Sequence, residues 1–134
     1  MANVSIDQAK VGDVIEAIQS VDKYRPIYYA GASGDFNPIH IDPEFGKMVG
    51  LGGAILQGLC TMGFAAKMLG RWAGDPAKIK KLRVRFKKPV KPNDDLTFKA
   101  VVTARDESSI TVEVEGINQD GEVVLGNAVA VIAL

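Results

Sequence analysis

The longest helical pattern in the chain is the apolar stretch Ala54-Ile55-Leu56-Gln57-Gly58-Leu59-Cys60-Thr61-Met62-Gly63-Phe64-Ala65-Ala66-Lys67-Met68-Leu69-Gly70-Arg71-Trp72. One stripe repeats at alternating spacings of four and three residues, the period of an α-helix, and consists of Ile55, Leu59, Met62, Ala66 and Leu69. Much of the remaining surface is also apolar, through Phe64, Ala65, Met68 and Trp72. Because a helix that is apolar nearly all round is buried, the stretch predicts a central helix over residues 54–72, ended by Gly70 and by Gly74-Asp75-Pro76.

The residues after this helix change to a period of two, which indicates β-strands. Apolar and polar residues alternate through residues 82–87, 96–104 and 111–115, and residues 122–133 form a final apolar run. Asp120-Gly121 is a hairpin signal before that last strand, and a further strand is expected over residues 13–21. One long buried helix, with a strand before it and a four-strand meander after it, is an α+β arrangement. Periodicity alone leaves open how the sheet and the helix pack.

The composition indicates a single folded domain over residues 1–134. Its 16 basic and 16 acidic residues cancel, so there is no overall field to attract nucleic acid or a membrane surface. Cys60 and His40 are the only cysteine and the only histidine of the chain. That is too few for an internal disulfide or for a zinc site of the usual kind, and no metal or cofactor is expected.

No targeting or membrane segment is expected either. The first residues lack a basic region followed by an apolar core, and the lone Cys60 fits a reducing compartment, so the sequence predicts a cytoplasmic location. Residues 48–66 carry no charge, but five glycines, Gln57 and Thr61 lower their apolarity. A buried helix therefore accounts for them better than a membrane span, which needs about 20 predominantly apolar residues.

A second informative stretch, residues 28–43, holds the only histidine, five positions after Asp35. Gly34 and Asn37-Pro38 are turn residues, which predicts irregular backbone between two helical segments. Asp22 is expected to cap the first of these, a short helix through residues 28–30 with Pro26 in its first turn. Asp35, Asn37 and His40 on one loop make a candidate acid/base site. On residue types alone, a turn in which Asp35 and Asn37 only bond their own backbone is about equally favoured.

Residues 29–40, Tyr-Ala-Gly-Ala-Ser-Gly-Asp-Phe-Asn-Pro-Ile-His, resemble the hydratase-2 motif of the MaoC-like dehydratase family, which includes (R)-specific enoyl-CoA hydratases. The resemblance extends to residues 54–59 and to the layout of the C-terminal half. It implies a single hotdog fold, in which a curved antiparallel sheet wraps around the long helix. It also implies that Asp35 and His40 are the catalytic acid–base pair.

The same resemblance implies hydration of trans-2-enoyl thioesters, or dehydration of (3R)-hydroxyacyl thioesters, carried by coenzyme A or acyl-carrier protein. Asp35 and His40 would jointly hold the water, and the backbone amide of Gly58 would stabilise charge on the thioester oxygen. Gly58 is expected near the helix N-terminus, where backbone N–H groups are unpaired. Asn37 and Gln57 complete the residues expected on the substrate side, with Asn37 favoured as a brace of its own turn.

Two residues depart from the family pattern. Many relatives have histidine where this chain has Gln57, and an ungapped alignment puts Ala66 where several hydratases carry a serine that braces the catalytic aspartate. Thr61 or Ser33 could replace that brace. Because of these two departures, an alternative stays open: the chain is a non-catalytic subunit that pairs with an active partner. A hotdog thioesterase is disfavoured, because it would want a carboxylate on the central helix and residues 51–66 contain no Asp or Glu.

Association through the sheets is expected, since hotdog folds generally pair in this way, which gives a homodimer or a heterodimer with a related chain. Pairing would also protect an open sheet edge from aggregation. Four basic residues, Arg83, Arg85, Lys87 and Lys88, lie along one predicted strand. They could meet coenzyme A phosphates or an acidic carrier-protein surface, although a solvated strand face is the favoured account.

Overall fold

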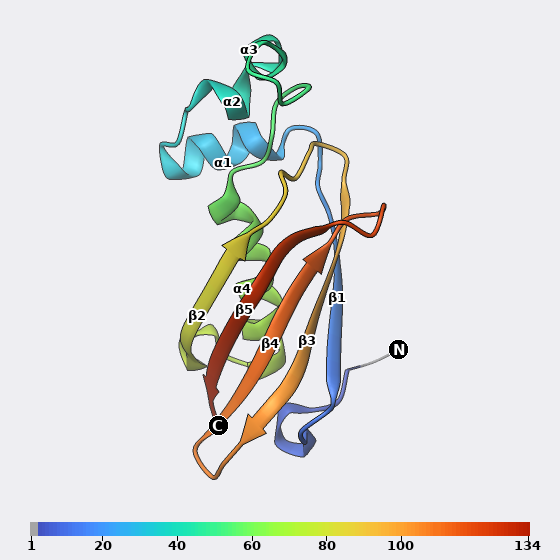
Figure 1. The fold of residues 1–134 in the computed structure, drawn as a ribbon. Coiled ribbons are helices and arrows are strands. Elements are labelled where there is room, and N and C mark those ends of the chain that lie inside the picture. The colour runs from blue at the N-terminus through green and yellow to red at the C-terminus, as the bar shows by residue number, and fades with distance from the viewer. Residues whose placement is uncertain (1–2) are drawn as a thin grey trace.

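The computed structural model describes residues 3–134 as one five-stranded antiparallel sheet with a long helix against one face (Figure 1). The strands are β1 (Val14–Ser20), β2 (Ile79–Phe86), β3 (Asp95–Arg105), β4 (Ser109–Ile117) and β5 (Val123–Ala133), in the sheet order β1-β3-β4-β5-β2. The helices are α1 (Arg25–Ser33), α2 (Pro38–Ile41), α3 (Pro43–Met48) and α4 (Gly58–Ala73), with short 3-10 turns η1 (Ile6–Gln8) and η2 (Pro76–Lys78).

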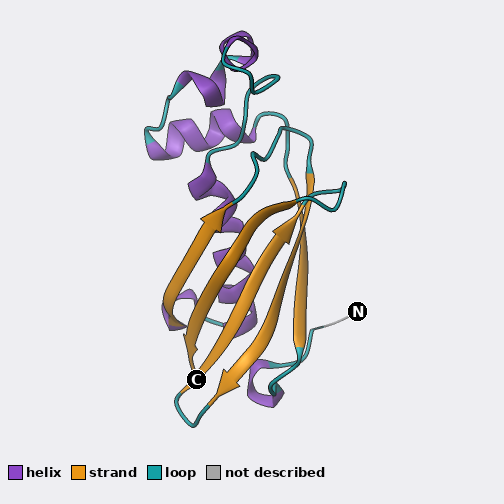
Figure 2. Cartoon of the chain, viewed as in Figure 1, coloured by secondary structure: helices purple, strands orange, loops and turns teal. Residues whose placement is uncertain are grey.

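The sheet and α4 together form the core. Alternate residues of β3 and β4, such as Phe98 and Val112, are fully buried, as are Ala65 and Leu69 of α4. Figure 2 shows α4 running along one face of the sheet, with the three short helices gathered beyond one end of the strands. This curved sheet around a central helix is the hotdog fold that the family resemblance implied.

The central helix begins later than the sequence predicted, at Gly58 rather than Ala54. Residues 54–57 are not helical, and they bond to other segments: the carbonyl of Ile55 accepts from His40 and is not used for a helical bond. The amide of Ile55 donates to the carbonyl of Ile39 at 3.0 Å, and the amide of Leu56 donates to Val90 at 2.7 Å. Gly70 does not end the helix. The end is at Gly74, whose left-handed backbone (φ 79°) closes the last turn.

The predicted buried stripe of α4 was also wrong in part. Leu59 is 64% exposed, whereas the buried face is formed by Cys60, Thr61, Phe64, Ala65, Met68, Leu69 and Ala73. Because the helix is apolar nearly all round, spacing alone gave two possible faces, and contact with the sheet selects between them. Of the residues predicted in the stripe, only Leu69 is fully buried on the helix.

The stretch 28–43 is more helical than predicted: residues 28–30 lie in α1 and residues 34–37 are irregular, as expected, but α2 and α3 fill most of the rest. Its turn residues act as helix caps: Gly34 ends α1 with a left-handed backbone (φ 77°), Asn37 caps α2, and Asp42 caps α3. Pro38 and Pro43 then occupy the first helical positions, where a missing N–H costs little. Only residues 34–37 and Asp42 interrupt the helices.

The expected cap of α1 by Asp22 was wrong. The cap position is Tyr24, while the Asp22 carboxylate accepts a hydrogen bond from the Tyr24 amide at 2.8 Å in the preceding turn. Pro26 does lie in the first helical turn, as predicted. Among the described residues, no helix is long and apolar enough to cross a membrane.

Gly116 of β4 offers a test of the core, since a Cβ atom there would meet the ring of the buried Phe98 at 2.7 Å. We expect Gly116→Ala to lower the free energy of unfolding by about 1–3 kcal/mol, the usual effect of overpacking a core. Gly31→Ala is the matched control, because an added Cβ there meets nothing within 4 Å in α1. That variant should gain roughly 0.5–1 kcal/mol. Urea unfolding measures both, and equal stability of the two variants would contradict the packing account.

Candidate active site

His40 is held in a defined orientation by the backbone. It lies in α2, is 8% exposed, and its Nδ1 is 2.8 Å from the carbonyl oxygen of Ile55. A carbonyl can only accept a hydrogen bond, so Nδ1 carries a hydrogen and donates it. In the neutral ring, Nε2 is then an unprotonated acceptor. The backbone of the segment before α4 therefore sets both the tautomer and the direction of the second ring nitrogen.

Asp35 faces that second nitrogen. Its Oδ2 lies 3.7 Å from Nε2 of His40, and its side chain is 45% exposed. The other oxygen, Oδ1, accepts a hydrogen bond from the amide of Asn37 at 3.3 Å. Asp35 therefore does both things that the sequence analysis considered. One carboxylate oxygen braces its own turn, and the other is directed at His40. The 3.7 Å separation is too long for a direct hydrogen bond and suits one bridging water.

The histidine lies in the wall between two hollows. One, of about 290 Å³, is lined by His40, Gly58, Thr61 and Phe86 among others. The second, of about 520 Å³, is lined by His40, Tyr24, Pro26 and Leu51 among others. An extended ligand could therefore pass His40 with one part in each hollow. Phe86 and the second hollow were missed in the sequence analysis, because residues 24–27, 51–54 and 91–92 meet only in the folded chain.

Gly58 is the first residue of α4, as the sequence predicted for the helix N-terminus. No hydrogen bond among the described residues uses its amide, which is one of the unpaired donors at the positive end of the helix dipole. A Cβ atom at this position would meet the ring of Phe86 at 3.1 Å. The glycine thus serves close packing against Phe86, and it lines the same hollow as His40 with its amide unpaired.

Two other residues were expected at the site, Gln57 and Asn37. The side chains of both make hydrogen bonds to the protein backbone. The side chain of Gln57 is 1% exposed and donates through Nε2 to the carbonyl of Pro26 at 2.9 Å, which ties α1 to the start of α4. Its Oε1 is buried with no hydrogen-bond partner in the described structure. Asn37 accepts from the amide of Ile39 at 3.2 Å, so it caps α2.

Ala66 lies in the middle of α4, about 12 Å along the helix axis from Gly58 at 1.5 Å per residue. It lines a hollow with Gly70, Gly74 and Pro76, whereas His40 and Gly58 line a different one. Ser33 is the hydroxyl next to Asp35, since its Oγ accepts a hydrogen bond from the Asp35 amide at 3.1 Å.

The basic residues of β2 and its following turn divide between two surfaces. Lys87 and Lys88 line the hollow that contains Gly58 and His40, and Lys88 pairs with Glu122. Arg83 instead lines a hollow with Lys99 and Glu113 on other strands of the sheet. Two further lysines, Lys23 and Lys91, line the second hollow beside His40 and had not been expected from the sequence.

Residues 3–134 contain no group of three or more His, Cys, Asp or Glu side chains arranged to hold a metal. Cys60 lies in the core, and burial raises the pKa of its thiol while the nearby Arg25 partly opposes the shift. Its thiol is therefore a packing group and not an activated nucleophile. The side chains at this site that face each other and can take up or give up a proton are therefore those of Asp35 and His40.

The fold and the motif at residues 29–40 are also found together in known proteins. The family model of the MaoC like domain matches residues 9–123. This chain belongs to the MaoC-like domain family. A probable enoyl-CoA hydratase 2 from Dictyostelium discoideum is 34% identical over 131 residues, which cover 96% of this chain and 43% of that protein. The peroxisomal hydratase-dehydrogenase-epimerase of Saccharomyces cerevisiae is 43% identical over 98 residues, 73% of this chain and 10% of that protein.

Solved structures agree with this placement. The (R)-hydratase from A. caviae involved in PHA biosynthesis superposes with a TM-score of 0.86 at 25% identity, covering 95% of this chain and 98% of that one. The ChsH1-ChsH2 complex from Mycobacterium tuberculosis gives 0.83 at 28% identity, with 95% and 99% covered. The chain spans less than half the length of the curated relatives it matches, so a MaoC-like unit is one part of those longer proteins.

The cap role of Asn37 can be separated from a substrate contact. Asn37→Asp keeps the oxygen that accepts from Ile39 but removes the amide hydrogens, whereas Asn37→Ala removes both. If the residue is a cap, the alanine variant should lose about 0.5–2 kcal/mol of stability and the aspartate variant almost none. Thermal melts beside steady-state kinetics measure this. A stable Asn37→Asp variant with strongly reduced turnover would instead show that the amide contacts substrate.

Proposed function

We propose that this protein catalyses the (R)-specific hydration of trans-2-enoyl thioesters and, in reverse, the dehydration of (3R)-hydroxyacyl thioesters. The observation that carries the proposal is the pair Asp35 Oδ2 and His40 Nε2, 3.7 Å apart, with the ring held through Nδ1 by the Ile55 carbonyl. Gly58, whose amide has no partner in the described residues, lines a hollow that His40 also lines. Relatives named enoyl-CoA hydratase 2 and (R)-hydratase support the proposal.

In this mechanism the pair holds one water molecule. A carboxylate oxygen and an unprotonated Nε2 are both acceptors, so a water between them donates one hydrogen to each and keeps its oxygen lone pairs for the substrate. The water oxygen adds to C3 of the enoyl group while one member of the pair takes a proton. A proton is then delivered to C2, which completes the addition of H and OH across the double bond.

The thioester oxygen gains negative charge while the new bond at C3 forms. The amide of Gly58 donates to that oxygen, helped by the positive end of the α4 dipole. Because this donor belongs to the backbone of a helix held in the core, it needs no reorganisation during the reaction. The lysines at the two hollows, Lys87, Lys88, Lys23 and Lys91, supply positive charge for coenzyme A phosphates or for an acidic carrier protein.

We also propose that the active form is a dimer, with a second copy or with a related chain. The apolar side chains of Tyr28, Phe36 and Leu59 are each more than half exposed on the segments that carry the site. β2 is an edge strand of the sheet, and edge strands present unpaired backbone groups. Pairing along β2 would remove that edge. A cytoplasmic location remains a prediction from sequence.

The two alternatives raised by the sequence are less well supported. A thioesterase would want a carboxylate on the central helix, and α4 carries none. A non-catalytic subunit would not need both members of the acid–base pair in facing positions, yet Asp35 and His40 face each other. The departure at Ala66 leaves the facing pair itself unchanged, since Ala66 and His40 line different hollows.

Removal of either acid–base group tests the mechanism. We expect Asp35→Asn and His40→Gln each to lower turnover of trans-2-enoyl-CoA roughly 10²–10⁴-fold, the usual contribution of such groups, with the fold retained. Loss of enoyl absorbance measures turnover, and circular dichroism checks folding. Glu44→Gln is the control, because it removes an exposed carboxylate from the same segment. Near-normal turnover in a folded variant would refute the role assigned to that residue.

The role of the Gly58 amide is tested by two variants read together. Gly58→Ala adds a methyl group in the hollow against the ring of Phe86, and we expect turnover to fall at least about tenfold, given that one oxyanion donor is typically worth ~10²-fold or more. Gly58→Ala combined with Phe86→Leu relieves the contact with the ring. If access to the amide is the reason for glycine, the second change leaves turnover low. Full recovery in the double variant would assign Gly58 to packing alone.

A further inference from the structure

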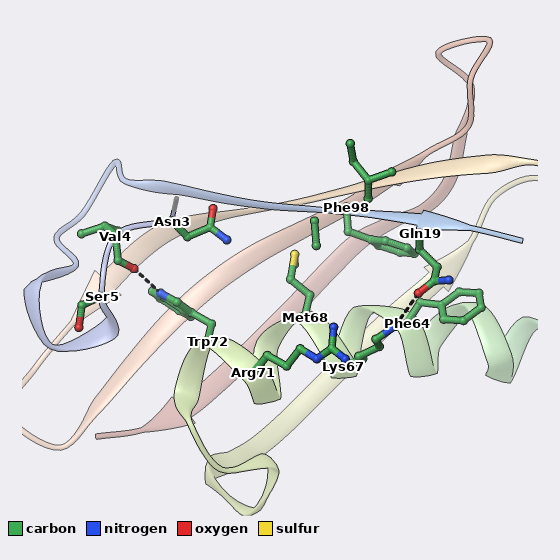
Figure 3. A pocket seen from close by; sticks show the side chains of 12 residues that line it. Asn3, Val4, Ser5, Gln19, Phe64, Lys67, Met68, Arg71, Trp72 and Phe98 are labelled. Atoms are coloured by element: carbon green, nitrogen blue, oxygen red, sulfur yellow. Dashed lines mark hydrogen bonds between the residues drawn. The ribbon is translucent and has the colours of Figure 1, made fainter. Parts of the chain in front are cut away.

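Another hollow lies between α4 and β1, and the hydration mechanism does not use it. It encloses about 350 Å³, and neither His40 nor Gly58 lines it. Figure 3 shows that α4 supplies one wall, through Phe64, Lys67, Met68 and Arg71. The opposite wall comes from β1, β3 and the N-terminal segment. The hollow is therefore separate from the two that meet at His40.

The floor of this hollow is apolar. Phe98, Met68 and Phe64 are 1%, 5% and 8% exposed, and the rings of Phe64 and Phe98 meet edge to face with centroids 6.5 Å apart. Trp72 forms one end, with its indole nitrogen donating to the carbonyl of Val4 at 2.7 Å. Because that polar group is already satisfied, the indole presents apolar surface to the hollow (Figure 3). Such a floor suits a hydrocarbon chain.

The rim is cationic and has no anionic partner. Lys67 and Arg71 are one helical turn apart, a spacing at which like charges repel. No Asp or Glu lines the hollow, and within residues 3–134 neither cation takes part in an ion pair. Lys67 Nζ donates once, to Oε1 of Gln19 at 2.8 Å, which leaves two of its three hydrogens. The helix dipole favours a cation only in the last turn, so it accounts for Arg71 and not for Lys67.

We propose that this hollow binds a single-chain amphiphile with an anionic head group, an alkyl carboxylate, with its chain on Phe64, Met68 and Phe98 and its head between Lys67 and Arg71. The apolar floor and the unpaired cations at the rim together select that chemistry over a neutral lipid or a polar metabolite. The hollow, about 350 Å³ and open to solvent on one side, is of a size for a medium-length chain such as decanoate. The site is independent of the proposed hydration reaction.

Trp72 provides a direct readout, because it is the only tryptophan of the chain and lines this hollow. Titration of the whole protein with decanoate should change the tryptophan fluorescence to saturation. Decan-1-ol, which has the same chain without the charge, should bind at least tenfold more weakly. Added salt should weaken decanoate and leave decan-1-ol unaffected. The absence of a saturable change with decanoate, or equal affinity for the alcohol, would overturn the proposal.

Paired charge variants locate the binding. Lys67→Gln with Arg71→Gln should weaken decanoate at least tenfold by fluorescence and by calorimetry. The control, Arg83→Gln with Lys99→Gln, removes the same charge from another surface and should bind like the original protein. All four side chains are exposed, so both variants should fold normally. Unchanged affinity in the first double variant would refute the site. His40→Gln should still bind decanoate, so the failure of either proposal is distinguishable from that of the other.

Discussion

The hydrogen bond from His40 Nδ1 to the carbonyl of Ile55 is the contact on which the site depends. A four-residue helix such as α2 is not stable by itself, because nucleation costs more than one turn returns. It is held by the Asn37 cap and by two bonds to residue 55, since the amide of Ile55 also donates to Ile39. These bonds join the loop with the acid–base pair to the segment that leads into α4, and so bring His40 beside Gly58.

The same bonds explain why α4 starts at Gly58. The carbonyl of Ile55 accepts from His40 Nδ1 and is therefore not used for a helical i→i+4 bond, while the amides of residues 55 and 56 tie this segment to Ile39 and Val90. The backbone of α3 also lies very close to the loop before α4. A Cβ atom on Gly46 of α3 would overlap the carbonyl of Gly53. The glycine therefore allows the 50–54 loop to lie against α3. Together these contacts place the first free amides of α4 where the histidine can share a ligand with them.

The long helix separates two kinds of surface. Thr61 on α4 faces the hollow that contains His40 and Phe86, and the Phe64, Lys67, Met68 and Arg71 side borders the hollow beside β1. Leu59, on the first turn of α4, is exposed, as is about half of the Asp35 side chain. One helix can thus serve the core, an acid–base site, a cationic rim and an association surface, because successive residues on it point 100° apart.

The sequence by itself determined the α+β class, the strands, the approximate central helix, and, through the motif at residues 29–40, the residues Asp35 and His40 and the hotdog fold. These depend on local periodicity and on a specific run of residues, which can be read along the chain. Only the tertiary structure decided which side of α4 is buried, where that helix begins, that turn residues 34, 37 and 42 cap helices, and that Ala66 and His40 line different hollows. Each of these depends on contacts between segments distant in sequence, as when the carbonyl of Ile55 selects the tautomer of His40, and no local pattern encodes such a pairing.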